Sequence, residues 1–164
     1  MTFRLTLALA ACFAPGIALA EAAPVDTDRL EACVSMSLAR DCVGTGIEEC
    51  PAALGGYSTV SHGFCLAAEM PWWEAHLDAV YTAGLARSRL IDADSANFGT
   101  PGRPSDVEAL QVMQQAWVAF RDAACGYEEL QWWGGSGSGI ASMECITAMT
   151  ADQIDRLQYF LSEE

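Results

Sequence analysis

Basic residues are scarce in this chain of 164 residues. Lysine and arginine together number 8, against 22 aspartates and glutamates, which gives a formal net charge of −14. Proteins that bind nucleic acid or anionic lipid need a cationic surface to contact phosphates, so both are poor partners for this chain. A basic protein, in contrast, would be attracted to it electrostatically.

Residues suited to catalysis or metal binding are also few. The only two histidines, His62 and His76, are not spaced with the cysteines, and no C-x-x-C pair occurs, so a zinc site is disfavoured. The glycine-rich stretch 134–139 contains neither a G-x-S-x-G nucleophile elbow nor a G-x-G-x-x-G phosphate loop in register. No nucleophile with a nearby base emerges, and we expect neither an enzyme nor a bound cofactor or metal.

Long apolar runs are missing except at the N-terminus. There Arg4 precedes a short apolar core, and small residues that resemble a signal-peptidase cleavage site end at Ala20. This order is typical of a cleavable signal peptide over residues 1–20. Cleavage would leave one domain, residues 21–164, with a net charge of −15, because the signal removes a single positive charge from −14. Lipoprotein processing at Cys12 is the alternative, and it would leave an unusually short signal. We expect a periplasmic or secreted protein without a membrane span.

Apolar residues elsewhere recur at spacings of three and four, and no strand-like alternation of useful length or internal repeat occurs. The pattern predicts an all-α fold, a small disulfide-stapled helical bundle. Capping-box spacing predicts that Ser105 and Thr150 open helices, and Pro71 suits the first turn of another. The first predicted helix begins near Asp28. The second runs from Pro71 to about residue 89, and the third from Ser105 to residue 127. A short helical piece at 143–148 precedes a last helix that begins at Thr150.

Side chains on the 105–127 helix have predicted structural roles. Trp117 and Phe120 lie on its apolar stripe, so we expect both in the core. Arg121 is next to Asp122, and we expect a buried or half-buried ion pair that holds the bundle together.

Seven cysteines are present, and six of them follow the predicted signal. An even set of thiols in a small exported protein is typical of a disulfide framework. Cys125 and Cys145 flank the glycine-rich stretch, and a bond between them would contribute about 3 kcal/mol by restricting the unfolded chain. The other four allow three connectivities, of which we prefer the nested one if the chain doubles back near residues 44–46: Cys33 with Cys65, and Cys42 with Cys50.

Two pairs of adjacent tryptophans stand out, Trp72-Trp73 and Trp132-Trp133. Neighbouring residues on a helix point about 100° apart, so one ring of each pair is expected at the surface. Exposed tryptophans are frequent anchors of protein interfaces. We therefore take Trp72, Trp132 and Trp133 as a candidate partner surface; the alternative is that both rings of a pair wedge between different helices.

Residues 115–125 read QAWVAFRDAAC, and they are followed by Gly135-Ser136, Cys145 and Met149-Thr150. This pattern resembles the LprI-like lysozyme-inhibitor N-terminal domain family. The resemblance implies a small, helical, disulfide-bonded protein of the cell envelope, over residues 21–164, and the family's namesake suggests inhibition of lysozyme. Glu74 and Asp78 depart mildly from the family pattern.

Three functional hypotheses follow. The first is an exported acidic inhibitor of lysozyme or a related basic cell-wall hydrolase. The second is a non-catalytic periplasmic binding or assembly module for another envelope partner. The third is an enzyme of a small-domain type, which a deep polar pocket with a shifted carboxylate would support.

Overall fold

The computed structural model describes residues 24–98 and 102–162. The predicted signal peptide, residues 1–20, and Cys12 lie outside the described residues. The described part is helical and contains no strand, so the predicted all-α fold is confirmed. Its elements are α1 (Thr27–Val34), the short 3₁₀ helices η1 (Ala39–Cys42) and η2 (Thr45–Ile47), α2 (Cys50–Ala53), α3 (Thr59–Phe98), α4 (Asp106–Gln131) and α5 (Ser138–Ser162).

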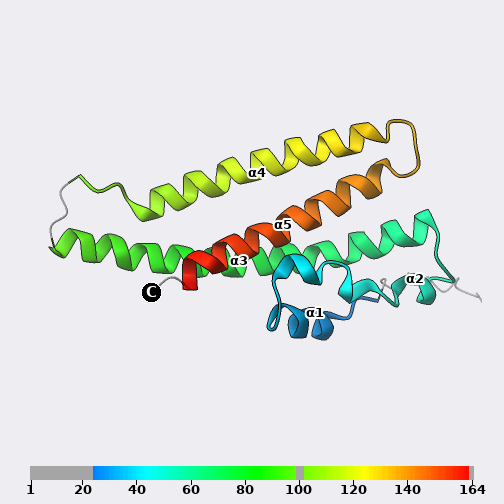
Figure 1. Cartoon of the computed structure of the whole chain (residues 1–164), viewed down its shortest axis with the longest axis horizontal. Coiled ribbons are helices and arrows are strands. Elements are labelled where there is room, and N and C mark those ends of the chain that lie inside the picture. Colours follow the sequence, from blue (N-terminus) through cyan, green and yellow to red (C-terminus); the bar gives the residue numbers. More distant parts are fainter. Residues whose placement is uncertain (1–23, 99–101, 163–164) are drawn as a thin grey trace, which may run out of the picture.

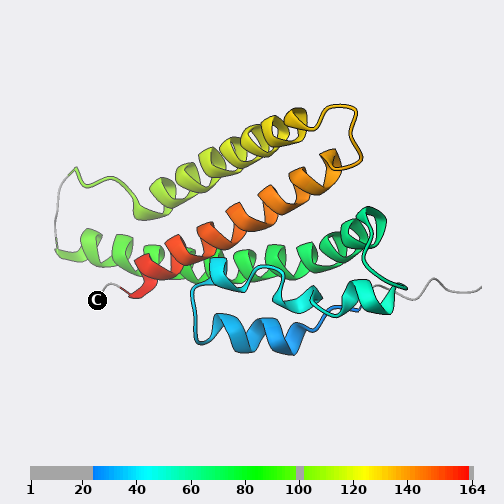
Figure 2. The same ribbon diagram turned by 45° about the vertical axis from the view of Figure 1, so that its right-hand side comes forward.

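Helix α5 lies between α3 and α4 and packs against both (Figure 1). The short elements α1, η1, η2 and α2 gather beside α3 and α5, away from α4 (Figure 2). The core forms where α1, α3 and α5 meet, and its largest fully buried side chain is that of Trp73. Burial of these apolar side chains provides the main stabilising free energy of the bundle.

The start of α4 is held by a side chain of α3. Ser105 is the N-cap, as predicted, and its hydroxyl accepts a hydrogen bond from the Glu108 N–H at 3.2 Å. Asp92 of α3 accepts from the Ser105 hydroxyl and the Asp106 N–H, both at 2.7 Å. Hydrogen bonding, first from the Ser105 hydroxyl, therefore lowers the pKa of Asp92.

The prediction that a helix begins at Pro71 is wrong, because Pro71 lies inside the 40-residue helix α3. Proline lacks the N–H that would bond to the carbonyl four residues earlier, at Ala67. Both Pro71 and Ala67 are exposed, so that carbonyl can bond to water instead. The predicted end near residue 89 is wrong as well, since α3 continues to Phe98.

The predicted helix start at Thr150 is also wrong, because α5 runs without a break from Ser138 to Ser162 and includes the piece predicted at 143–148. Thr150 and Gln153 are both buried inside it. A spacing of three residues suits a capping box, but it also places two side chains on one face of a continuing helix. Here that face points inward, and the Gln153 amide donates to Gln114 Oε1 at 2.9 Å.

Three disulfides join the six cysteines of the described chain. The predicted bond between Cys125 and Cys145 is confirmed. The nested arrangement of the other four is wrong, because each disulfide instead joins elements that follow one another along the chain. Helix α1 is followed by a return turn to η1, and α2 by a turn into α3, so these neighbours lie side by side: the bonds are Cys33 to Cys42 and Cys50 to Cys65.

A buried carboxylate of α3 holds the η2 turn. Glu69 is fully buried and accepts the backbone N–H groups of Gly44 and Gly46, each at 3.2 Å. Burial raises the pKa of Glu69, and the two N–H donors only partly oppose this effect. Gly46 lies so close to α1 that an added Cβ would be 2.6 Å from Leu30 Cδ1, so any side chain there would force Leu30 to move.

A second buried carboxylate, from α5, holds η1. Asp155 accepts the backbone N–H of Ala39 at 2.6 Å and that of Arg40 at 3.2 Å. The Arg40 guanidinium also donates to Asp155, at 3.2 Å. Buried backbone N–H groups require a partner, and here side chains of the long helices supply it. The N-terminal short helices are thus attached to the bundle by Glu69, Asp155 and the Cys50–Cys65 disulfide.

Candidate functional site

The loop between α4 and α5 projects at one end of the molecule, where neither α3 nor the short helices cover it (Figure 1). Trp132 is the C-cap of α4, and Gly134 follows with a left-handed φ of 77°, a conformation that glycine adopts without strain. The Cys125–Cys145 disulfide links the two helices near this end. The loop therefore extends from a covalently closed helical hairpin.

The two tryptophans of this loop differ in their surroundings. The Trp132 ring lies against the backbone of Gly137, where an added Cβ would be 3.1 Å from ring atom Cε3. Trp133 is 84% exposed. Its indole presents a large apolar surface to water at the tip of the hairpin, as an interface anchor would.

The other tryptophan pair lies in the bundle. Trp73 is buried, and Trp72 is half-buried and stacks on His76 with 5.0 Å between ring centroids. Burial lowers the pKa of His76. The structure therefore separates Trp72, on α3, from Trp132 and Trp133, on the hairpin loop, and does not bring the three predicted residues into one patch.

The hairpin is strongly acidic. Residues 122–155 contain six acidic and no basic side chains, and all of the acids except the buried Asp155 are exposed. Two of the acids, Glu128 and Glu129, lie near the C-terminal end of α4, where the helix dipole disfavours negative charge. Their position does not stabilise the helix, which is consistent with a role in attracting a cationic partner.

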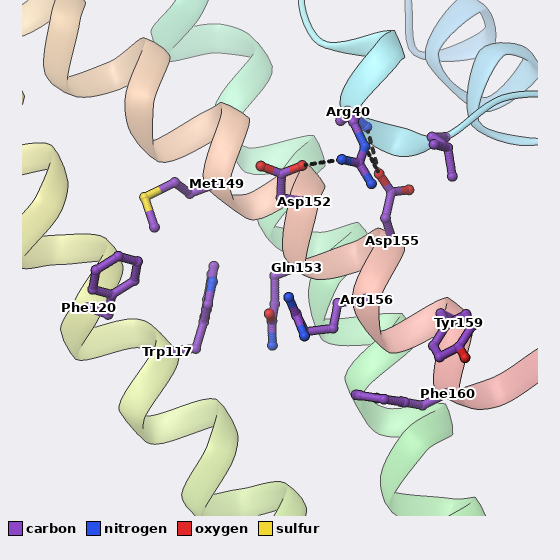
Figure 3. Close-up of a pocket in the computed structure, with 11 residues that line it drawn as sticks. Arg40, Trp117, Phe120, Met149, Asp152, Gln153, Asp155, Arg156, Tyr159 and Phe160 are labelled. Atoms are coloured by element: carbon purple, nitrogen blue, oxygen red, sulfur yellow. Dashed lines mark hydrogen bonds and ion pairs between the residues drawn. The ribbon is translucent and has the colours of Figure 1, made fainter.

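Two open grooves follow α5. One, of about 550 Å³, lies beside the tip and is lined by Trp132, Glu128 and Glu144 among others. The second, of about 650 Å³, lies further along α5, and Met149 lines both. Figure 3 shows the second groove, with aromatic rings from α4 on one side and from the end of α5 on the other.

One of the residues that line the second groove, Phe120, lies elsewhere than its apolar spacing predicted. Phe120 was predicted in the core, but its side chain is 64% exposed and lines the groove (Figure 3). It lies on the edge of the α4 stripe, on one wall of the groove, whereas Trp117 is half-buried against the core. Tyr159 and Phe160 of α5 also line this groove, and nothing in the sequence marked them as surface residues.

The predicted pair of Arg121 and Asp122 forms, with 2.9 Å between Nη2 and Oδ1. Both residues belong to α4, and Asp122 is exposed, so the pair does not hold two helices together and that part of the prediction is wrong. The Arg121 guanidinium instead lies 5.0 Å from the Trp117 ring centroid, in a cation–π contact.

Within residues 24–98 and 102–162, no group of three or more His, Cys, Asp or Glu side chains is placed to hold a metal ion. A His62–Glu144 contact of 3.0 Å links α3 to α5 near the tip. No helix of the described chain is both long and apolar enough to cross a membrane.

The domain is helical and disulfide-closed, and its acidic hairpin carries an exposed tryptophan at the tip. These are features of a protein-binding module. A family model described as "Lysozyme inhibitor LprI" matches residues 50–157. The chain belongs to the LprI lysozyme inhibitor family, as the motif in residues 115–125 predicted. No curated protein and no solved structure matches it.

Proposed function

We propose that this protein inhibits lysozyme or a related basic cell-wall hydrolase by binding it through the tip of the α4–α5 hairpin. Membership of the LprI family supports the class of target. The observation that carries the proposal is Trp133, an 84% exposed indole within a stretch, residues 122–155, that has five exposed acidic side chains and no basic ones.

The two features act at different stages of binding. The acidic hairpin attracts a cationic enzyme and accelerates the encounter, an effect that salt screens. Trp133 then provides apolar area that becomes buried at the interface. The Cys125–Cys145 disulfide limits the conformations of the free loop, which lowers the entropy lost on binding.

The proposed site of action is outside the cytosol. Residues 1–20 have the charge and apolar pattern of a cleavable signal, which would release residues 21–164. Three disulfides are consistent with an oxidising compartment, since such bonds are rare in reducing cytosol. We therefore place the mature protein in the periplasm or among secreted proteins.

The test is a lysozyme activity assay with the purified, oxidised chain from residue 21 to 164. Inhibition should be strongest at about 20 mM salt and weaken as salt rises, because the Debye length shortens. Trp133→Ala should weaken inhibition by at least about tenfold, as expected for an interface anchor. Leu90→Ala is the matched control, since Leu90 is similarly exposed but lies near the C-terminal end of α3. The α4–α5 loop lies toward the other end of that helix (Figure 1).

If the wild-type protein changes the activity of neither lysozyme nor a second basic cell-wall hydrolase, even at low salt, the proposal is wrong. A binding or assembly role with another envelope partner would then replace it. If inhibition occurs but Trp133→Ala inhibits as well as wild type, the tip is not the contact.

A further inference from the structure

Helix α4 carries a second apolar face that packs against nothing in the described chain. Its members follow one another at alternating spacings of four and three residues, and all of them are exposed. They are Val112, Ala116, Ala119, Ala123, Gly126, Leu130 and, just beyond the helix, Trp133. We call this set the outer seam.

The outer seam lies on the side of α4 that faces away from the bundle. Leu110, Met113 and Trp117 pack against the core, and at 100° per residue the seam positions inside α4, from Val112 to Leu130, point to the opposite side. In both ribbon views α4 forms an edge of the described molecule, with α5 on one side only (Figures 1 and 2). The seam is therefore an unpartnered helix face.

The spacing indicates which shape of partner fits. A four-three repeat is the heptad pattern by which one helix packs on another, with side chains of one inserting between those of its partner. The small central residues let a partner helix approach closely, and an added Cβ at Gly126 would meet no atom within 4 Å. With Phe120 and Tyr127 on one flank, the exposed side chains offer on the order of 800 Å², the area that each protein contributes to a standard interface.

Charge indicates which helix fits. The flank opposite Phe120 and Tyr127 consists of the residues before Ala116, Ala123 and Leu130: Gln115, Asp122 and Glu129. A helix lying along the seam would place its own flanking side chains against the carboxylate of Glu129 and that of Asp122, which also contacts Arg121. Lysine or arginine there would be attracted, whereas a second copy of this chain, aligned antiparallel, would place acid against acid.

We propose that the outer seam of α4 binds an amphipathic helix with a basic flank on the surface of the target enzyme. This inference rests on the proposed function and extends the contact from the tip along the whole of α4. Trp133 belongs both to the hairpin tip, as its exposed anchor, and to the outer seam, as its last position. The tip and the seam are nevertheless separable by mutation.

The seam is tested by Ala119→Arg, which adds a bulky cation at its centre, with lysozyme as the binding probe. Ala86→Arg on α3 is the matched control, because Ala86 is also an exposed alanine inside a helix. Circular dichroism establishes that both variants fold. We expect at least a tenfold loss of lysozyme affinity for Ala119→Arg and no change for Ala86→Arg.

A carbodiimide cross-linking experiment tests the charge argument. All eight basic residues of this chain are arginines, so carboxyl-to-amine cross-links can involve only its N-terminal amine or the lysines and N-terminal amine of the partner. We expect Asp122 and Glu129 to be linked to lysines on a single helix of lysozyme. Links from these two residues to scattered, non-helical lysines would contradict the proposal.

The other outcomes are distinct. If lysozyme binds wild type and Ala119→Arg equally, the seam inference is overturned and the proposed function stands. If wild type binds neither lysozyme nor a second basic cell-wall hydrolase, both are overturned together. A wild-type dimer in sedimentation that Ala119→Arg dissociates would show that a second copy occupies the seam, and this also overturns the proposal.

Discussion

Asp155 offers a sharp test of how the N-terminal helices are attached to the bundle. Its carboxylate accepts three hydrogen bonds from η1, two from backbone N–H groups and one from the Arg40 guanidinium. Asp152, one turn earlier on α5, also contacts Arg40, at 3.5 Å. The two aspartates thus share a helix and an ionic partner but differ in burial, since the side chain of Asp155 is 4% exposed and that of Asp152 is 57% exposed.

This difference in burial determines the expected free energies. Asp155→Ala would leave the buried Ala39 N–H without a partner, and each lost bond to a charged group costs about 1.5–3 kcal/mol. Because water can enter to replace part of the loss at Arg40, we expect a total of about 3 kcal/mol. Asp152→Ala removes only an exposed ion pair, which contributes about 0–1 kcal/mol.

The measurement is urea unfolding followed by circular dichroism, with all disulfides intact. In a thermal melt of the same variants, a loss of about 3 kcal/mol corresponds to a decrease in Tm of roughly 6–12 °C for a domain of this size. Trypsin provides a local readout, because cleavage after Arg40 should accelerate in Asp155→Ala. The cut becomes visible after reduction, since the Cys33–Cys42 disulfide spans it. Equal stability of the two variants, or a loss below about 1 kcal/mol for Asp155→Ala, would refute this account of the attachment.

Further predictions concern two glycines and two titrating carboxylates. Gly46→Ala should destabilise the fold by about 1–3 kcal/mol, because its Cβ would overlap Leu30. Gly126→Ala lies in open space within α4 and should stabilise the fold by about 0.5–1 kcal/mol. Thermal melts of the two variants test both predictions. The folded-state pKa of Glu69 is raised, so the stability of wild type relative to Glu69→Gln should fall as pH rises above 4.5, and a flat difference would contradict this. The folded-state pKa of Asp92 is lowered, so wild type should be more stable than Asp92→Asn above pH 3.8 and lose this extra stability as pH falls through the folded-state pKa. A stability difference that persists in acid would contradict this.

The sequence predicted those features that depend on local pattern. Apolar spacing indicated the helices, the Ser105 cap placed the start of α4, and the residues around Cys125 indicated the family. It failed where one pattern is compatible with two structures. Pro71 and Thr150 both lie at positions that can open a helix or continue one, and tertiary packing of α3 and α5 decided for continuation.

The site was only partly predictable, for a related reason. Adjacent tryptophans indicate that some ring is exposed, but only the direction of the hairpin determines that Trp133 is the most exposed of them. Phe120 has the spacing of a core residue, yet α5 packs slightly to one side of it and leaves it in a groove. Glu69 and Asp155 are single acids in a sequence with 22, so nothing distinguishes them until their backbone partners are known.

The attachment of the N-terminal helices and the proposed binding surface involve different parts of this molecule. The N-terminal helices, residues 24–49, precede the family match at 50–157, yet both carboxylates that hold them, Glu69 and Asp155, lie inside the matched region. A buried carboxylate is costly unless it is hydrogen-bonded, so a family member without such a segment would gain by replacing both residues. The face of α4 opposite the bundle takes no part in this attachment. It can therefore change to suit the proposed partner without loosening the attachment of the N-terminal helices.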